Sequence, residues 1–169
     1  LIKGIFFPMF ETLIQKLQED RYLTLETTPQ HEPSMHNIIE RIKKFKLQDR
    51  VDGFSCTDNP LAKLKYNALF ASLKLQMEFK KPVIATMTMR DRNKIALQSD
   101  LLGANDFDVR AILALTGDPA KMSDQPNSKG VFEANSLMLL KMIKSFNYGM
   151  DFAGHPFKIE PKQIFPFAV

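Results

Sequence analysis

Residues 83–89 read Val-Ile-Ala-Thr-Met-Thr-Met, and residues 111–115 read Ala-Ile-Leu-Ala-Leu. Both runs are short and rich in apolar side chains, a pattern typical of strands that are buried in a parallel sheet. The residues between them carry apolar side chains at helical spacing. The two runs therefore predict neighbouring parallel strands joined by a helix.

The same alternation extends along the chain in both directions. Further strands are predicted at residues 22–28 and 51–56 and at 164–169, where Pro166 is an unusual feature for a strand. Helices are predicted at residues 9–19, 34–45, 58–75, 91–103 and 134–146. The expected N-cap of the second helix is Ser34, that of the third is Asp58 or Asn59, and that of the fourth is Asp91. The expected apolar faces include Leu61, Leu64, Ala68, Ala71 and Leu75 in the third helix, and Ile95 and Leu102 in the fourth, which should end at Gly103.

Five strands alternating with helices fit two α/β architectures, an open doubly wound sheet and a parallel (β/α)8 barrel of the TIM type. A doubly wound sheet usually carries a glycine-rich loop after its first strand, but residues 27–31 contain no glycine. We therefore expect the barrel, as a single domain over residues 1–169. A complete barrel normally needs about 200 residues or more, so we expect an incomplete one with about five β/α units. The absence of an initiator Met suggests a start further upstream.

Composition narrows the class of protein. The chain has 169 residues, of which 44% are hydrophobic and 25% charged, as in ordinary globular domains. No apolar run approaches the roughly 18 residues that span a bilayer, and no signal-peptide pattern is present. The single cysteine, Cys56, excludes an internal disulfide framework and fits a reducing, cytoplasmic compartment as a small buried filler. The net charge of +4 is spread over helical faces, which argues against nucleic-acid binding.

Ligands of parallel β/α folds bind at the loops that follow the strands, which selects a set of candidate residues. These are Glu26, Thr27 and Thr28; Ser55, Thr57, Asp58 and Asn59; Thr86, Thr88, Arg90, Asp91 and Arg92; and Thr116, Gly117 and Asp118. Glu26 stands out because it lies within a strand-like run directly before Thr27, Thr28 and a proline. Partial burial would raise its pKa and suit it to general acid catalysis. The alternative is a carboxylate paired with Arg90 or Arg92.

Asp118 lies in a Thr-Gly-Asp-Pro turn after an apolar strand. Gly117 lacks a side chain, so a ligand could approach the backbone closely there, although Gly-Asp-Pro is also a common turn sequence. Both interpretations stay open on the residues alone. His31 and His36 are five residues apart and do not match the spacing of a helical metal-binding pair, so no metal site is predicted.

Four segments together resemble the methylenetetrahydrofolate reductase family, particularly its bifunctional and clostridial-type branches. They are the helix followed by Leu23-Thr24-Leu25-Glu26-Thr27-Thr28-Pro29, the stretch from Arg90-Asp91-Arg92-Asn93 to Gly103-Ala104, the stretch Leu113-Ala114-Leu115-Thr116-Gly117-Asp118-Pro119, and Val131-Phe132-Glu133 leading into a helix. The resemblance runs from about residue 10 to the end of the chain.

This resemblance implies a (β/α)8 barrel that holds FAD and reduces 5,10-methylenetetrahydrofolate to 5-methyltetrahydrofolate, a step of one-carbon metabolism and methionine biosynthesis. Glu26 corresponds to the acid that protonates the folate nitrogen, and Asp118 to the aspartate beside the flavin ring. The implied cofactor-binding residues are Ser55, Thr86, Thr88, Leu115, Thr116, Gly117, Asp118 and Ala134. Thr86 stands where many members carry histidine, and Gln30 stands where many carry a second proline.

The implied partners are a folate substrate and an electron donor, either a reduced nicotinamide or a redox partner protein. Later strands of the family supply further cofactor and substrate contacts, so we expect either that the chain is a fragment or that a homo-oligomer or another chain completes the barrel. Two other functions stay open: a barrel homologue that binds without turnover, and a pterin-binding methyl-transfer subunit of a larger complex.

Overall fold

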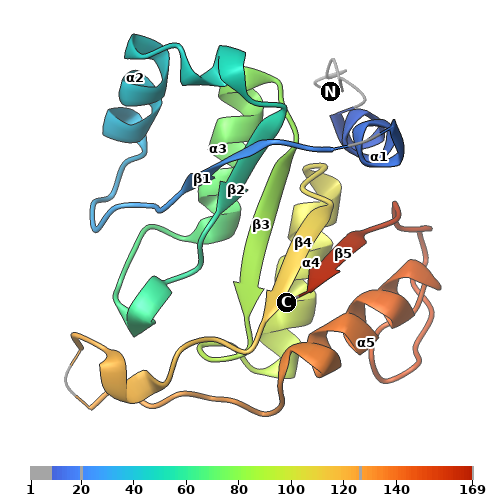
Figure 1. Cartoon of the computed structure of the whole chain (residues 1–169). Helices are drawn as coiled ribbons and strands as arrows, with labels where there is room; N and C mark the ends of the chain where they lie inside the picture. The colour runs from blue at the N-terminus through green and yellow to red at the C-terminus, as the bar shows by residue number, and fades with distance from the viewer. Residues whose placement is uncertain (1–8, 20, 126, 169) are drawn as a thin grey trace.

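The computed structural model describes residues 9–19, 21–125 and 127–168. In these residues the strands are β1 (Thr24–Thr27), β2 (Gly53–Cys56), β3 (Val83–Thr88), β4 (Ala111–Leu115) and β5 (Phe165–Ala168). The α-helices are α1 (Met9–Glu19), α2 (His36–Lys44), α3 (Ala68–Phe79), α4 (Lys94–Asp106) and α5 (Ser136–Asn147). Short 3-10 turns occur at η1 (Leu47–Arg50), η2 (Pro60–Ala62) and η3 (Ala120–Met122). The predicted alternation is thus present (Figure 1), although residues 1–8 and Val169, at the ends of the predicted segments, lie outside the described residues.

The five strands form one parallel sheet in the order β1-β2-β3-β4-β5. Each strand therefore pairs with its neighbours in the sequence. A doubly wound sheet reverses its strand order at a switch point, so this sequential order excludes that architecture. The fold is α/β with parallel strands alternating with helices, which agrees with part of a TIM-type barrel.

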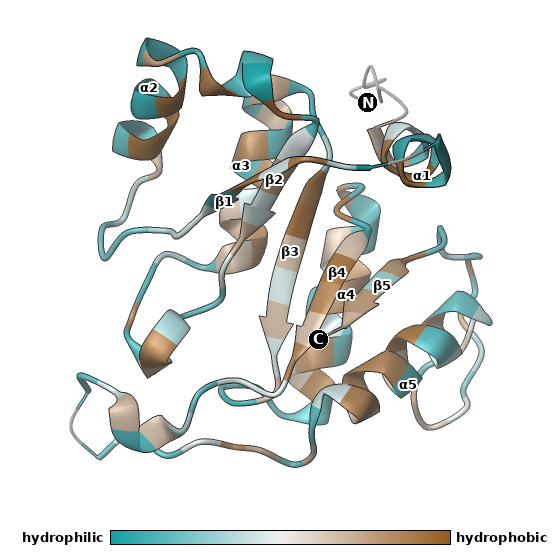
Figure 2. Cartoon of the chain, in the orientation of Figure 1, coloured by the Kyte–Doolittle hydropathy of each residue, from teal (hydrophilic) through white to brown (hydrophobic). Residues whose placement is uncertain are grey.

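The sheet has one face packed against helices and one face without them. Met87, Ile112 and Ala114 are buried against α4 and α5, and Phe54 and Cys56 are buried against α2 and α3. Because side chains of a strand alternate between its faces, the intervening residues of β3 and β4 project to the other side. Figure 2 shows the apolar character of β3 and β4, which lie in the middle of the sheet.

Two predicted helix starts were wrong. The helix expected from residue 58 or 59 begins instead at Ala68, where the Asn67 side chain accepts hydrogen bonds from the backbone of Leu69 at 2.9 Å and Phe70 at 3.1 Å. The residues before it form η2, in which Leu61 has a φ of 56°. The predicted apolar face is therefore correct for Ala68, Ala71 and Leu75, which are buried, but wrong for Leu61 and Leu64, which are exposed.

The fourth helix also differs from its prediction. Its N-cap is Asn93, which accepts a hydrogen bond from the backbone of Ala96 at 2.9 Å, and not Asp91. The buried face is formed by Leu97, Leu101, Ala104 and Asn105, whereas Ile95 and Leu102 are exposed and Gly103 lies within the helix. In α2 the N-cap is Met35, although Ser34 still accepts a hydrogen bond from the backbone of His36 at 3.0 Å. No helix in the described ranges is long and apolar enough to cross a membrane.

Arg110 joins α1 to the amino-terminal end of β4. Its guanidinium lies 4.0 Å from the centre of the Phe10 ring and donates to the carboxylate of Glu11 at 3.1 Å. The same guanidinium donates to Asp108 at 2.7 Å, and Arg110 is largely buried. These contacts hold α1 beside the amino-terminal ends of the central strands, away from the edge where the loops carry the candidate residues (Figure 1).

Candidate active site

A hollow of about 400 Å³ opens at the carboxyl-terminal ends of β1 to β4, on the face of the sheet that lacks helices. This volume lies within the range of small-molecule binding sites. The residues that line it come from four strands and the loops after them: Glu26, Thr57, Asp58, Pro60, Thr86, Thr88, Arg90, Leu113, Leu115, Thr116, Gly117 and Asp118. The fold therefore brings together segments that are separated by more than ninety residues in the sequence.

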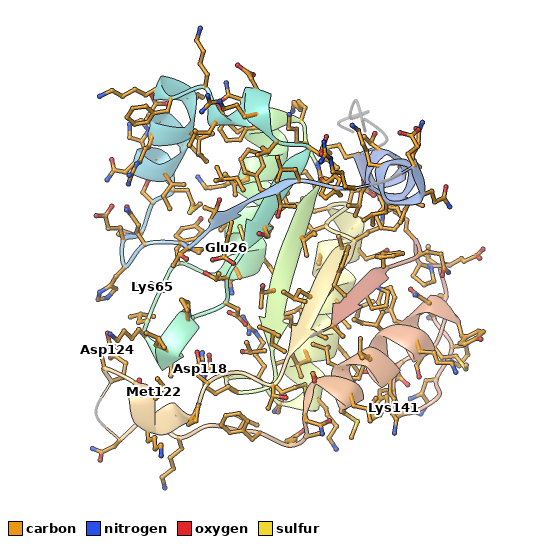
Figure 3. All side chains as sticks on the ribbon, in the orientation of Figure 1. Glu26, Lys65, Asp118, Met122, Asp124 and Lys141 are labelled. Atoms are coloured by element: carbon orange, nitrogen blue, oxygen red, sulfur yellow. The ribbon has the colours of Figure 1, made fainter. Side chains whose placement is uncertain are left out.

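Most of the residues singled out from the sequence line this hollow. Glu26 and Asp118, the two proposed catalytic carboxylates, do so together with Asp58, and Figure 3 shows Glu26 and Asp118 near the carboxyl ends of the strands with η2 between them in this view. So do Thr86, Thr88, Leu115, Thr116 and Gly117. Ser55 does not line it but lies beside Glu26 as its partner in the adjacent strand. Ala134 lies outside the hollow and packs against the apolar cluster of α4 and α5.

Glu26 differs from its prediction in two respects. Its side chain is exposed, so the partial burial expected from the sequence is absent in this structure. The reason is its position on β1, at one edge of the sheet, on the face that no helix covers. Nor does it pair with Arg90 or Arg92, which bind other carboxylates among the described residues. Glu26 is left accessible to a ligand in the hollow.

Gly117 and Asp118 begin the loop that follows β4, and both are closely packed against neighbouring segments. The carboxylate of Asp118 accepts a hydrogen bond from the backbone of Leu61 at 2.6 Å, which fixes η2 beside the hollow. Gly117 has a φ of +97°, and a Cβ atom there would lie 3.0 Å from Arg90 Cβ and 3.1 Å from Thr88 Cβ. Glycine is therefore required at this position by both backbone conformation and packing.

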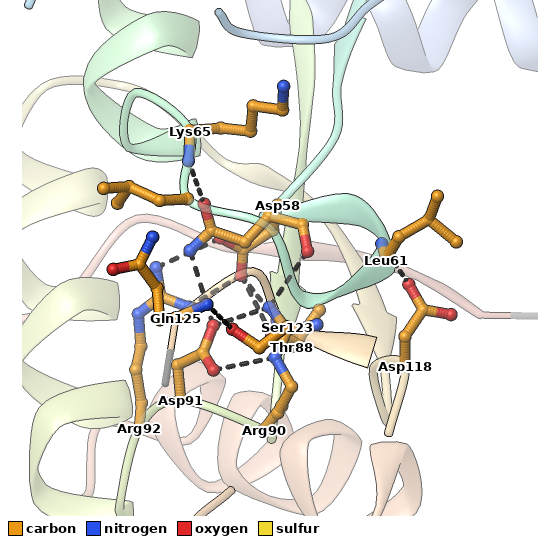
Figure 4. A network of polar contacts seen from close by, with 12 residues as sticks. Asp58, Leu61, Lys65, Thr88, Arg90, Asp91, Arg92, Asp118, Ser123 and Gln125 are labelled. Carbon is orange, nitrogen blue, oxygen red and sulfur yellow. Dashed lines mark hydrogen bonds and ion pairs between the residues drawn. The ribbon is translucent and has the colours of Figure 1, made fainter. Parts of the chain in front are cut away.

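The loops after β2 and β3 are joined by a buried ion pair (Figure 4). Arg92 Nη1 lies 2.6 Å from Asp58 Oδ2, and Arg92 Nε lies 2.8 Å from Asp100. Asp58 Oδ2 also accepts hydrogen bonds from the backbone of Thr88 at 3.0 Å and from its hydroxyl at 3.1 Å. Because the Thr88 hydroxyl uses its proton on Asp58, its oxygen can only accept a hydrogen bond from a ligand.

Arg90 is buried, with 2% of its side chain exposed, and binds Asp91 through two nitrogens. Nε donates to Asp91 at 2.7 Å and Nη2 donates to it at 2.6 Å, while Nη2 also donates to the backbone carbonyl of Asn59 at 3.0 Å. Burial alone would raise the pKa of Asp91, but its ion pair with Arg90 outweighs this and holds the pKa below its usual value. The charged state of both groups is thereby favoured.

Sequence reasoning placed Arg90 and Arg92 in the right loops but did not identify their partners. Arginine is seldom fully buried, and no local pattern distinguishes the buried Arg90 and the largely buried Arg92 from arginines that are exposed. Among the residues that the structure describes, no group of three or more His, Cys, Asp or Glu side chains could hold a metal ion.

Fold and site together define a parallel β/α protein of the barrel class, with a ligand-sized hollow at the carboxyl ends of its strands that is lined by three carboxylates, four threonines and a buried arginine. Residues 11–163 match the family model described as methylenetetrahydrofolate reductase. The chain therefore belongs to the methylenetetrahydrofolate reductase family, which is a family of oxidoreductases. A search of curated proteins finds no match to the chain.

Proposed function

We propose that the protein takes part in the flavin-dependent reduction of 5,10-methylenetetrahydrofolate to 5-methyltetrahydrofolate, in a cytoplasmic pathway of one-carbon metabolism that leads to methionine. One observation carries this proposal. Glu26 on β1 and Asp118 after β4, which the family resemblance assigns to the acid and to the aspartate beside the flavin, line the same hollow. Membership of the family supports an oxidoreductase in general.

The residues around the hollow fit FAD as the cofactor. Thr86, Thr88 and Thr116 offer hydroxyl groups, and Gly117 brings the backbone to the surface of the hollow. The oxygen of Thr88 is restricted to accepting a hydrogen bond, which suits an N–H group of the flavin ring. Ser55 and Ala134, which do not line the hollow, stay part of the proposed cofactor site on the family resemblance. When bound, the flavin would supply the hydride that reduces the folate.

In the proposed reaction Glu26 holds a proton on its carboxyl group and delivers it to the folate nitrogen, so that the methylene bridge opens. Its exposure at the edge of the sheet leaves it free to meet the substrate. A folate bound over it would displace water from the carboxyl group and bring the folate nitrogen to it. Asp118 is held by the Leu61 backbone and provides a fixed negative charge beside the reacting groups.

The proposal extends to the partners of the reaction. A folate is the proposed substrate, and a reduced nicotinamide or a redox partner protein is the proposed electron donor. The bifunctional or clostridial-type branch is the proposed subdivision of the family. The edge strands β1 and β5 have unpaired backbone groups on their outer sides in the described sheet, which supports a further chain or a second copy as a binding partner.

The experiment that tests this function is an absorption spectrum of the purified protein during titration with FAD. We expect the visible bands of the flavin to shift as it enters the hollow. Asp118→Asn should weaken this binding, and Asp124→Asn is a matched control, because Asp124 lies in the same loop but does not line the hollow. Absence of flavin binding would contradict the proposal. Flavin binding without reduction of methylenetetrahydrofolate would favour a binding homologue instead.

A further inference from the structure

Arg90 has an unused hydrogen-bond donor in the interior of the protein. Among the residues that the structure describes, the buried side-chain polar atoms without a partner are Arg90 Nη1 and Gln48 Oε1. Gln48 is a neutral side chain in η1, remote from the hollow, but Arg90 carries a full positive charge. A buried cationic donor that lacks an acceptor is unfavourable, so its retention calls for a ligand or a water molecule.

The other contacts of Arg90 determine the direction of this donor. Asp91 binds Nε and Nη2, so its carboxylate lies along one edge of the planar guanidinium, and Nη1 occupies the corner away from that edge. Arg90 lies between two hollows: a smaller one of about 130 Å³, which Asp91 also lines, and the candidate active site, which Asp91 does not line. Nη1 is therefore the part of the guanidinium that Asp91 leaves without an acceptor, in a residue that lines the candidate active site.

Charge balance in the hollow makes this donor significant. Arg90 is the only cationic residue among the described residues that line it, whereas Glu26, Asp58 and Asp118 are carboxylates. Asp58 is neutralised by Arg92, but Glu26 and Asp118 have no ion-pair partner within the described ranges. A ligand that becomes negatively charged in the hollow would be repelled by Asp118, and among the described lining residues Arg90 supplies the positive charge that could offset this repulsion.

We propose that Arg90 is a further cofactor-binding residue, whose Nη1 donates a hydrogen bond to the carbonyl oxygen on the pyrimidine edge of the flavin and stabilises its reduced form. The inference rests on the proposed function. A hydride brings two electrons and one proton to the flavin, so the net charge of the ring falls by one. This negative charge is shared between the ring nitrogen N1 and the adjacent carbonyl oxygen, which are the atoms that a guanidinium binds well.

The surroundings of Arg90 keep it charged in this role. The hydrogen bonds and charge of Asp91, followed by the charges of Asp58 and Asp118, outweigh burial and raise the pKa of Arg90. Gly117 packs on the Cβ atom of Arg90, which restricts the side chain to its observed path. The donor is therefore held in place before a ligand binds, so that little free energy is spent on reorganising the side chain.

The test is the reduction potential of bound FAD in the wild type, Arg90→Gln and Arg90→Lys. Arg90→Gln removes the positive charge and should lower the preference of the protein for reduced over oxidised flavin at least tenfold. This corresponds to a fall of about 30 mV in the reduction potential of a two-electron couple. Arg90→Lys keeps the charge but not the planar fork, so its fall should be smaller. Arg41→Gln, on the exposed surface of α2, is the control and should leave the potential unchanged.

The outcomes separate the two proposals. If the wild type binds no FAD, both the function and the role of Arg90 fail. If FAD binds and the potential is the same in Arg90→Gln as in the wild type, the role of Arg90 fails while the function stands, and Nη1 is solvated by water.

A measurement on the wild type alone covers the case in which neither Arg90 variant folds. Arg90 should keep the reduced flavin anionic below neutral pH. The charged and titratable groups that face Arg90 are Asp91, Asp58 and Asp118, with Glu26 across the hollow. The potential should then change by about 30 mV per pH unit, as for one proton per two electrons. A slope of about 59 mV, as for two protons, would overturn the assignment.

Discussion

Arg92 Nη1 and Asp58 Oδ2 lie 2.6 Å apart, and this contact joins the loops after two adjacent strands beneath the candidate active site. The side chain of Asp58 is 2% exposed and that of Arg92 is 13% exposed, so the pair is shielded from solvent. Since Asp58 also binds the backbone and hydroxyl of Thr88, the ion pair sets the position of a residue that lines the hollow.

Asp58→Ala should destabilise the protein by about 3–5 kcal/mol, because it leaves Arg92 short of a partner in the interior and frees the Thr88 donors. Urea denaturation followed by circular dichroism measures this loss. Lys16→Ala is the control, because its ion pair with Asp52 is partly exposed to solvent and should contribute less than about 1 kcal/mol. Equal effects of the two substitutions would contradict the structural role of Asp58.

Gly117→Ala should lower both thermal stability and affinity for FAD. The substitution forces alanine into a φ of +97° and pushes its Cβ against Thr88 and Arg90. Gly154→Ala separates these effects, because Gly154 has a similar φ of +92° but no atom within 4 Å of an added Cβ. We expect a loss of about 1–2 kcal/mol for Gly154→Ala, from backbone strain alone, and a larger loss for Gly117→Ala. If both variants lose the same stability, the packing around Gly117 is unimportant.

Glu26→Gln should leave flavin binding unchanged and lower the rate of folate reduction by about 10²–10⁴, the usual contribution of a general acid. The amide is close in size to the carboxyl but carries no transferable proton. Reduction of the flavin by the electron donor should continue in this variant, and only its reoxidation by methylenetetrahydrofolate should slow. Stopped-flow absorbance of the flavin measures the two half-reactions separately. Normal reoxidation would remove Glu26 from the proposed role.

The alkaline stability of the protein should depend on Cys56. Burial raises the pKa of this thiol from 9.0 to about 11, against a smaller opposing effect of its hydrogen bond with Ser72. Because the folded state favours the neutral thiol, its contribution is complete below about pH 9 and is lost as the pH rises to about 11, with a total of about 3 kcal/mol. Urea denaturation between these pH values should show a steeper decline for the wild type than for Cys56→Ala. Parallel curves would contradict the assignment.

The strands could be predicted well from the sequence because their signal is local. Residues 111–115 coincide with β4, since a short apolar run bounded by polar and turn-forming residues has few alternatives to a buried strand. The positions of Glu26 and Asp118 at the strand ends followed from the same signal. Their presence in one hollow could be expected because the carboxyl ends of parallel strands share one edge of the sheet.

The starts of the third and fourth helices were predicted wrongly, and both errors have one physical cause. Asp58 and Asp91 each precede an apolar run, which is where a capping residue is expected. In the structure their carboxylates bind Arg92 and Arg90 instead, and asparagines further along cap the helices. A local rule cannot show whether a carboxylate will cap the helix backbone or bind a guanidinium, whether that guanidinium is adjacent, as Arg90 is to Asp91, or in another loop, as Arg92 is for Asp58.

The exposure of the Glu26 side chain could not be predicted from the sequence, for a related reason. A strand pattern shows that two faces exist, but the burial of each face depends on the layer that covers it. In the described residues, helices cover only the face that carries Phe54, Met87 and Ile112. The alternation that placed Glu26 correctly in a strand therefore gave no information about its access to water.

The sequential strand order also has a consequence for the way the chain folds. Each pairing of strands, from β1–β2 to β4–β5, joins strands that follow one another in the sequence. The sheet can therefore grow by one strand and its connecting helix at a time as the polypeptide leaves the ribosome. The contact between Glu11 and Arg110 is different, because it spans 99 residues. The first helix must therefore wait until β4 has been synthesised before it can dock, and its docking should be a late event of folding.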